Sequence, residues 1–240
     1  MTTLPLVAVG FMFAALAASQ TPGGPGKPGP VGMVLPVPGH PLSAEQIEER
    51  TTQPPGGPVS TEIVESKVYR DTAGRLRIEM TIPGPSGDSS QLVSLVDPIA
   101  GSLVVLVAEE KIAARLLAPK SSDHGFGFGF NDVEIPLPSG TGKRFTENLG
   151  TRTIDGIEME GTRLTRTSAD PASEPAVSEH WFAKDLAVTG MAEGSGPGAR
   201  HTARLRILDR NEPDPALFVI PADYTVQDLR PTSPRISPIR

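Results

Sequence analysis

The sequence predicts a mainly β protein built on one strongly curved antiparallel sheet of about eight to ten strands, with one or two short helices. After Val59, short runs of apolar and β-branched residues are separated by turn-forming residues at the spacing typical of such a sheet. Arg75 to Ile82 alternates strictly between apolar and polar residues, which is typical of a strand with one buried face. Asp155-Gly156 between two strand-like runs is the strongest local hairpin signal.

The first residues have the features of a secretory signal peptide. Leu4 to Ala18 is an uncharged apolar run, and the small residues Ala17 and Ser19 precede Gln20. We expect cleavage after residue 19 and an exported, periplasmic or secreted chain. A retained anchor is the alternative, although this run is shorter than the ~20 residues that span a bilayer. No later stretch is long enough for a transmembrane segment.

Composition divides the rest of the chain into three parts. Residues 20–58 are rich in Pro and Gly and predict a flexible tether, with a possible short helix where Ser43 and Gln46 form a capping box. Residues 59–225 form the predicted antiparallel domain. Residues 226–240 are Pro-rich and basic, and predict a disordered tail.

The first half of the domain contains four or five predicted strands. Thr61 to Arg70 and Arg75 to Ile82 form one hairpin. Leu92 to Asp97 and Ser102 to Ala108 are apolar at successive positions, so we expect them at the centre of the sheet with both faces covered. Glu109 to Leu117 fits either a strand or a short helix.

The second half begins with a long Gly- and Pro-rich segment, residues 118–147. Hairpins are then predicted around Asp155-Gly156 and around Lys184-Asp185. Gly194 to Gly198 turns the chain into a last strand, Arg200 to Asp209.

Three aromatic residues in the long segment are the predicted ligand-binding residues: Phe126, Phe128 and Phe130. In an extended segment they share one side, with glycines on the other. Glycine loses more backbone entropy on ordering than other residues, so the rings need a surface to pack against. They either cover an edge or mouth of their own sheet or form a movable lid over an apolar ligand.

Composition and motif spacing argue against several function classes. The net charge is −6 and the aromatic share is 5%, which disfavours nucleic-acid binding. The chain has no cysteine, and His40, His124, His180 and His201 are scattered singly, so we predict no disulfide and no metal site.

Catalytic templates also fail. Ser139 to Arg144 resembles the end of a phosphate-binding loop, but the glycine that should open the loop is Leu137 and the hydroxyl after the lysine is Arg144. Residues 125–130 lack the spacing and the strand-helix context of a dinucleotide site. No serine has the G-x-S-x-G pattern. We therefore predict no catalytic residue, no cofactor and no enzymatic activity.

Two groups of residues in the last strands are expected to be structural. Trp181, the only tryptophan, lies in an alternating run beside a tight turn and is predicted to be in the core, whereas His180 points to the opposite face. Arg204 and Arg206 alternate with apolar residues, so we expect them on a solvated sheet face.

Three stretches resemble a group of uncharacterised bacterial secreted proteins and, more distantly, the half-barrel superfamily of the lipoprotein carrier LolA and the envelope-stress sensor RseB. The stretches are Tyr69 to Met80 with Val96 to Gly101, Leu149 to Arg163 with Glu179 to Leu186, and Glu212 to Tyr224. The resemblance implies an open half-barrel whose concave apolar side holds acyl chains or faces a helical lid. It provides no catalytic residues.

The expected function is a non-catalytic binding or sensing module of the periplasm or cell envelope, for an apolar ligand such as a lipid or an acylated protein. The alternative is an interaction or scaffold protein that binds an envelope polypeptide through its sheet edge and tails.

Export predicts that the mature chain begins near Gln20. Intact-mass measurement of the protein from envelope material should show the loss of about nineteen residues. A mature chain that still begins at Met1 or Thr2 would contradict processing.

Overall fold

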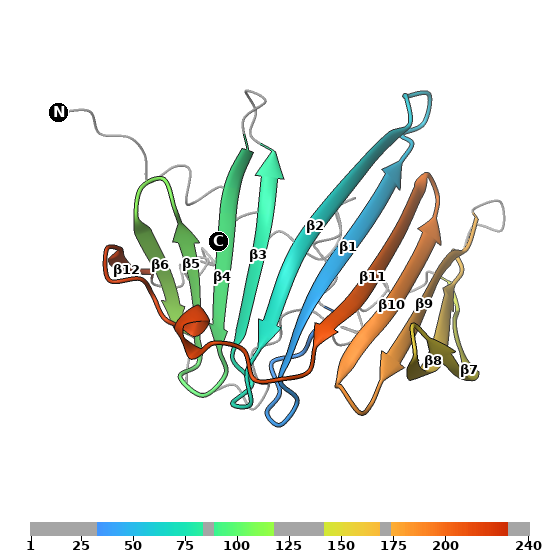
Figure 1. Cartoon of the computed structure of the whole chain (residues 1–240). Helices are drawn as coiled ribbons and strands as arrows, with labels where there is room; N and C mark the ends of the chain where they lie inside the picture. Colours follow the sequence, from blue (N-terminus) through green and yellow to red (C-terminus); the bar gives the residue numbers. More distant parts are fainter. Residues whose placement is uncertain (1–32, 84–88, 118–141, 169–173, 230–240) are drawn as a thin grey trace, which may run out of the picture.

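The computed structural model describes residues 33–83, 89–117, 142–168 and 174–229. Phe126, Phe128 and Phe130, the signal segment and residues 230–240 lie outside this part. The described residues form one open sheet of twelve strands, in the order β12-β6-β5-β4-β3-β2-β1-β11-β10-β9-β8-β7 (Figure 1). The strands are β1 Leu42–Thr52, β2 Ser60–Arg70, β3 Leu76–Pro83, β4 Ser89–Asp97, β5 Ser102–Val107, β6 Ile112–Leu117, β7 Arg144–Ile154, β8 Ile157–Arg166, β9 Ala176–Ala183, β10 Val188–Gly196, β11 Ala199–Asp209 and β12 Thr225–Leu229.

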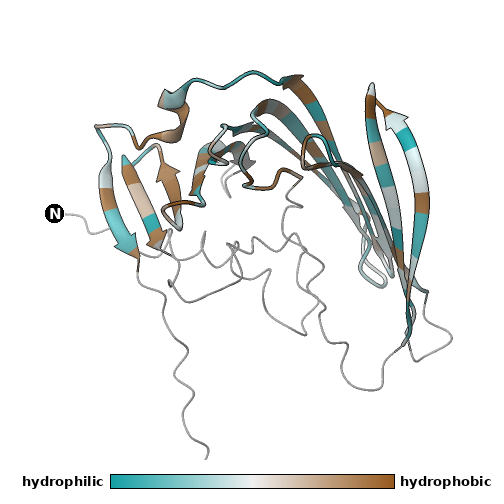
Figure 2. Cartoon of the chain, turned by 90° about the horizontal axis from the view of Figure 1, so that it is seen from below, coloured by the Kyte–Doolittle hydropathy of each residue, from teal (hydrophilic) through white to brown (hydrophobic). Residues whose placement is uncertain are grey.

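The sheet is bent into an arch, as Figure 2 shows, and the predicted mainly β class with one curved sheet is confirmed. All neighbouring strands are antiparallel except β12, which pairs in parallel with β6. The helical content of the described residues is one short 3-10 helix, η2 (Pro215–Phe218). None of the described residues belongs to a helix with the length and apolarity needed to span a membrane.

Most predicted hairpins are present. The Asp155-Gly156 turn joins β7 to β8 with positive φ at both residues, 52° and 76°. This is the backbone conformation that a two-residue hairpin turn requires and that Asp-Gly favours. Gly198, with φ 66°, lies in the turn that leads from β10 into β11.

The predicted short helix after Ser43 is wrong, because this segment is strand β1. A capping box contributes only about 1 kcal/mol to a helix. As a strand, the segment pairs along its length with β2 on one side and with β11 on the other. It also buries Leu42 and Ala44. The sheet therefore begins inside the predicted tether.

Two further predictions need correction. Residues 226–229 were expected in a disordered tail but belong to β12, where Asp228 forms an ion pair with Arg115 of β6 at 2.7 Å. The strongly apolar strands β4 and β5 have both faces covered as predicted, yet they lie near one edge of the sheet instead of at its centre. The segment after Glu109, left open between strand and helix, forms strand β6.

The C-terminal segment explains how the outer face of β4 and β5 is covered. Residues 212–224 cross one face of the sheet, the outer face, on the convex side of the arch (Figures 1 and 2). There Ile220 and Tyr224 pack against an outer-face cluster formed by Leu95, Val104, Leu106 and Ala113. The Arg77 side chain donates a hydrogen bond of 3.0 Å to the carbonyl of Leu217 and fastens the segment to β3.

The opposite face of β1 to β6 and β11 is the inner face. Residues of neighbouring strands that lie opposite one another in register share a face, which places Leu42, Val68, Leu76, Val96 and Leu103 together there. All five are at most 4% exposed and belong to the main hydrophobic cluster.

Trp181 is buried in the main cluster at 5% exposure, as predicted. Its ring lies over Gly161 of β8, where a Cβ atom would come within 2.6 Å of the ring carbons. The guanidinium of Arg152 lies over the ring, 3.9 Å from the ring centroid. Glycine at position 161 is therefore required for the ring to pack against the β8 backbone.

Arg70, at the end of β2, is fully buried and joins three parts of the chain. Its guanidinium donates hydrogen bonds to the carbonyls of Leu35 at 2.8 Å, His40 at 2.6 Å and Ala187 at 3.2 Å, and to that of Leu186. Burial lowers the pKa of Arg70 to about 10, so the side chain is still protonated at neutral pH.

Replacing Arg70 with methionine should destabilise the protein by on the order of 3–5 kcal/mol, because four buried or partly buried carbonyls each lose a donor at about 1–3 kcal/mol. Chemical denaturation measures this loss. The matched control is Arg200→Met on an exposed position of β11, which should change stability by less than ~0.5 kcal/mol. A loss below ~1 kcal/mol for Arg70→Met would contradict an anchoring role.

Candidate ligand-binding site

The inner face changes in exposure from one end of the strands to the other. At the end that contains Leu42, Val68 and Leu76, the apolar side chains are buried. Toward the opposite end of the face, four apolar side chains are only half-buried: Val64 on β2, Met80 on β3, Val107 on β5 and Ile112 on β6. Leu92 of β4, which is level with Met80 and Val107, is buried. The half-buried group forms the apolar strip.

A polar cluster lies on the inner face beside this strip. Gln46, Glu48 and Arg50 occupy alternate positions of β1 and therefore point to the same face. His201 of β11 lies opposite Arg50, and Ser66 of β2 lies opposite Gln46. These five residues, on three neighbouring strands, form the inner polar cluster.

Glu48 is the most deeply buried member of the cluster at 5% exposure. Its Oε1 accepts a hydrogen bond from the Gln46 amide, and its Oε2 lies 3.5 Å from Nε2 of His201. A buried carboxylate is costly unless such groups compensate it, so Glu48 is held by its neighbours within the sheet.

The side chain of Arg50 has no bonding partner among the described residues. Its Nε is buried and has no hydrogen-bond acceptor, and its guanidinium forms no ion pair or hydrogen bond with any residue in the described part of the chain. Two ionisable residues lie opposite it in register, His201 on β11 and Glu62 on β2, but neither is bonded to it. The guanidinium therefore keeps its donors free at the half-buried end of the inner face.

The cluster does not have the geometry of a nucleophilic triad. Gln46 of β1 lies opposite both Ser66 of β2 and Leu205 of β11, so these three residues are in one row. His201 lies four residues away from Leu205 along β11. Four strand residues span about 13 Å, which is beyond hydrogen-bond reach of the Ser66 hydroxyl. Within the described ranges, no three His, Cys, Asp or Glu side chains are grouped so that they could hold a metal ion.

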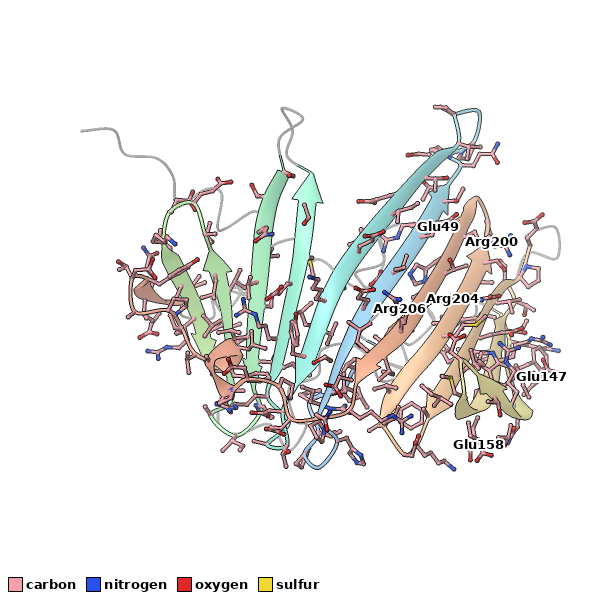
Figure 3. The ribbon with its side chains drawn as sticks, viewed as in Figure 1. Glu49, Glu147, Glu158, Arg200, Arg204 and Arg206 are labelled. Atoms are coloured by element: carbon pink, nitrogen blue, oxygen red, sulfur yellow. The ribbon has the colours of Figure 1, made fainter. Side chains whose placement is uncertain are left out.

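Charged residues occupy the outer face of the same strands. Figure 3 labels Arg200, Arg204 and Arg206 on β11 and Glu49 on β1. Arg204 and Arg206 are exposed, which confirms that they lie on a solvated face. The Glu45 carboxylate forms an ion pair with Arg206, and this contact raises the pKa of Arg206 above its usual value.

The residues singled out in the sequence are mostly not brought together. The Nδ1 atom of His40 donates a hydrogen bond to the Asp185 carbonyl, 3.0 Å away, and not to a residue of the cluster. His180 is exposed on β9 and is separated from His201 by strand β10. The cluster of Glu48, Arg50 and His201 was not predicted, although the alternation of Gln46, Glu48 and Arg50 would have indicated a shared face had the segment been assigned as a strand.

Comparison with known proteins gives distant structural similarity only. No model of a known family matches the sequence, and no curated protein matches it. The similar solved structures include the lipoprotein LppX of Mycobacterium tuberculosis, with 12% identity, a TM-score of 0.33 and coverage of 69% of this chain and 85% of that one.

Two more are similar at the same level. A LolA superfamily protein of Nitrosomonas europaea has 10% identity and a TM-score of 0.32, and the matched region spans 72% of this chain and 88% of that protein. The complex of MucA and MucB from Pseudomonas aeruginosa contains a chain with 12% identity and a TM-score of 0.35, and the matched region spans 78% of this chain and 59% of that one. A LolA superfamily protein is therefore among the solved structures to which this chain is distantly similar.

Proposed function

We propose that the protein is a non-catalytic binding module of the bacterial envelope that takes an apolar ligand, a lipid or an acylated protein, on the inner face of its sheet. The observation that supports this most is the apolar strip. Val64, Met80, Val107 and Ile112 leave apolar surface half-buried on the inner face of an open sheet. In the described part of the chain, no strand or helix forms a second layer over this face.

Physical chemistry favours an acyl chain as the occupant. An apolar sheet face must be covered to be stable, by a second layer or by a ligand. The outer face of β4 to β6 obtains its cover from the C-terminal segment. An alkyl chain on the inner face would gain about 0.8 kcal/mol for each buried CH₂ group.

Substitution in the apolar strip tests this function. The double variant Val64→Gln, Val107→Gln should bind a fluorescent fatty acid about tenfold more weakly than the wild-type protein, because the chain loses apolar contacts worth on the order of 1–2 kcal/mol. The control is Ile63→Gln, the sequence neighbour of Val64, which is 61% exposed on the outer face. Equal losses in both variants, or no binding by the delipidated wild-type protein, would contradict the proposal.

The ligand-binding role of Phe126, Phe128 and Phe130 stays a prediction, because these residues lie outside the described part of the chain. If they contact the ligand, replacing all three with serine should change fatty-acid uptake while the midpoint of chemical denaturation stays the same. If they cover the protein's own sheet, the same variant should lose stability. Unchanged stability together with unchanged uptake would contradict both roles.

A second candidate function is the binding of an envelope polypeptide through the sheet edge. Strand β7 ends the sheet, is eleven residues long and is exposed at nearly every position. Exposed edges of this kind accept added strands. Native mass spectrometry of the protein purified from its own envelope separates the two functions, because a co-purifying lipid supports the first and a co-purifying polypeptide supports the second.

A further inference from the structure

We propose that Arg50 binds the anionic head group of the acyl ligand, so that the site selects amphiphiles with a carboxylate or phosphate head over neutral ones. This inference rests on the proposed function, since it concerns the head of a ligand whose chain lies on the apolar strip. The observation behind it is the Arg50 guanidinium, which has no bonding partner among the described residues although its Nε is buried.

A partnerless guanidinium at this depth needs an anion. Arginine remains charged at every physiological pH, and a partly buried charge is unfavourable until it is paired and hydrogen-bonded. The planar fork of the guanidinium matches the two oxygens of a carboxylate or phosphate, and such charge-assisted pairs are stronger than neutral hydrogen bonds. Arg50 therefore has unused donors of the type that an oxyanion accepts.

The protein's own carboxylates do not use these donors. Glu48, two residues earlier on the same face, accepts from Gln46 and lies beside His201 instead of Arg50. Glu62 lies opposite Arg50 on β2, but its side chain is exposed and is not bonded to the guanidinium. An incoming anion would meet the two cationic or hydrogen-bonding side chains that face each other in register, Arg50 and His201.

The position of Arg50 fits an amphiphile. Val64 and Met80, on β2 and β3, are the next strip residues toward the edge of the sheet. In register, Arg50 is level with Glu62 of β2, and Val64 lies two residues further along that strand. Met80, Val107 and Ile112 form a row that is level with Gln46. An alkyl chain that starts at Arg50 and runs obliquely across the strands would therefore pass Val64 before it reaches this row. Arg70, the other arginine of the inner face, cannot take this role, because it is fully buried and bonded to four carbonyls.

The test compares three amphiphiles with the same alkyl chain and different heads: hexadecanoate, hexadecyl phosphate and hexadecanol. Each displaces a fluorescent fatty acid from the delipidated full-length protein. We expect the wild type to bind the two anionic amphiphiles about ten- to a hundredfold more tightly than the alcohol, the range of a charge-assisted hydrogen bond. The tighter of the two anions then distinguishes a fatty acid from a phospholipid-type head.

Two variants assign the preference to Arg50. Arg50→Gln should bring the affinity for hexadecanoate down to that for hexadecanol, whose affinity should stay within about twofold of wild type. Arg200→Gln is the matched control. Arg200 lies on the outer face, opposite Thr51, which is the residue after Arg50 on β1. This control should leave the preference for anions unchanged.

Glu62→Gln provides a test that leaves Arg50 in place. Removal of the carboxylate opposite Arg50 should strengthen hexadecanoate binding several-fold and leave hexadecanol binding unchanged, since it removes a repulsive charge.

The outcomes separate this inference from the proposed function. Equal wild-type affinity for hexadecanoate and hexadecanol, or a preference that persists in Arg50→Gln, would overturn the role of Arg50 while leaving acyl binding in place. Failure of the wild type to bind any of the three amphiphiles would overturn the proposed function and this inference with it. If Arg50→Gln does not fold, an unchanged hexadecanoate affinity in Glu62→Gln would still count against Arg50.

Discussion

The arrangement of the sheet depends on one buried cation. Arg70 ends β2 beside Leu42, its register partner on β1, and donates hydrogen bonds to carbonyls of the segment before β1 and of the β9 to β10 turn. These carbonyls lie outside the strand ladders, and carbonyls that are buried without donors would be unfavourable. The guanidinium satisfies them together and so fixes where the chain enters β1 and where β10 begins. The closed, fully buried end of the inner face follows from this contact.

Coverage of the sheet faces accounts for the rest of the architecture. A single sheet has two faces, and each apolar region on them needs a second layer. Residues 212–224 form this second layer on the outer face of β4 to β6. Arg77 holds the segment by its hydrogen bond to Leu217, and the Arg75 guanidinium lies over the Phe218 ring, 5.1 Å from the ring centroid. Where no such layer exists, over β1 and β11, the outer face is charged, with ion pairs such as Glu45 with Arg206. Burial of the outer face of β4 and β5 is thus a property of coverage by the C-terminal segment and not of central position.

This explains which features could be predicted from the sequence. Hairpins such as that at Asp155-Gly156 depend on local turn chemistry, and they were predicted correctly. Strand β1 was missed because its inner face contains Gln46 and Glu48, which conceal the alternation, while Ser43 and Gln46 imitate a helix start. The polar cluster was missed for the same reason, since Arg50 and His201 are about 150 residues apart in sequence and only the antiparallel register of β1 and β11 brings them level. Long-range pairing has no local signal at either residue.

Two arginines of the inner face show how the same side chain acquires different roles. Both lie on strands of one hairpin, Arg50 on β1 and Arg70 on β2, near opposite ends of the face. Arg70 is enclosed by backbone carbonyls, which use its donors and make it part of the scaffold. Arg50 lies where the face is half-buried and where the nearest carboxylates are engaged elsewhere or turned to solvent, so its donors are left for another molecule. Arg70 satisfies its hydrogen bonds within the chain. Arg50 does not, so it is the residue of this face at which an anion would gain the most binding free energy.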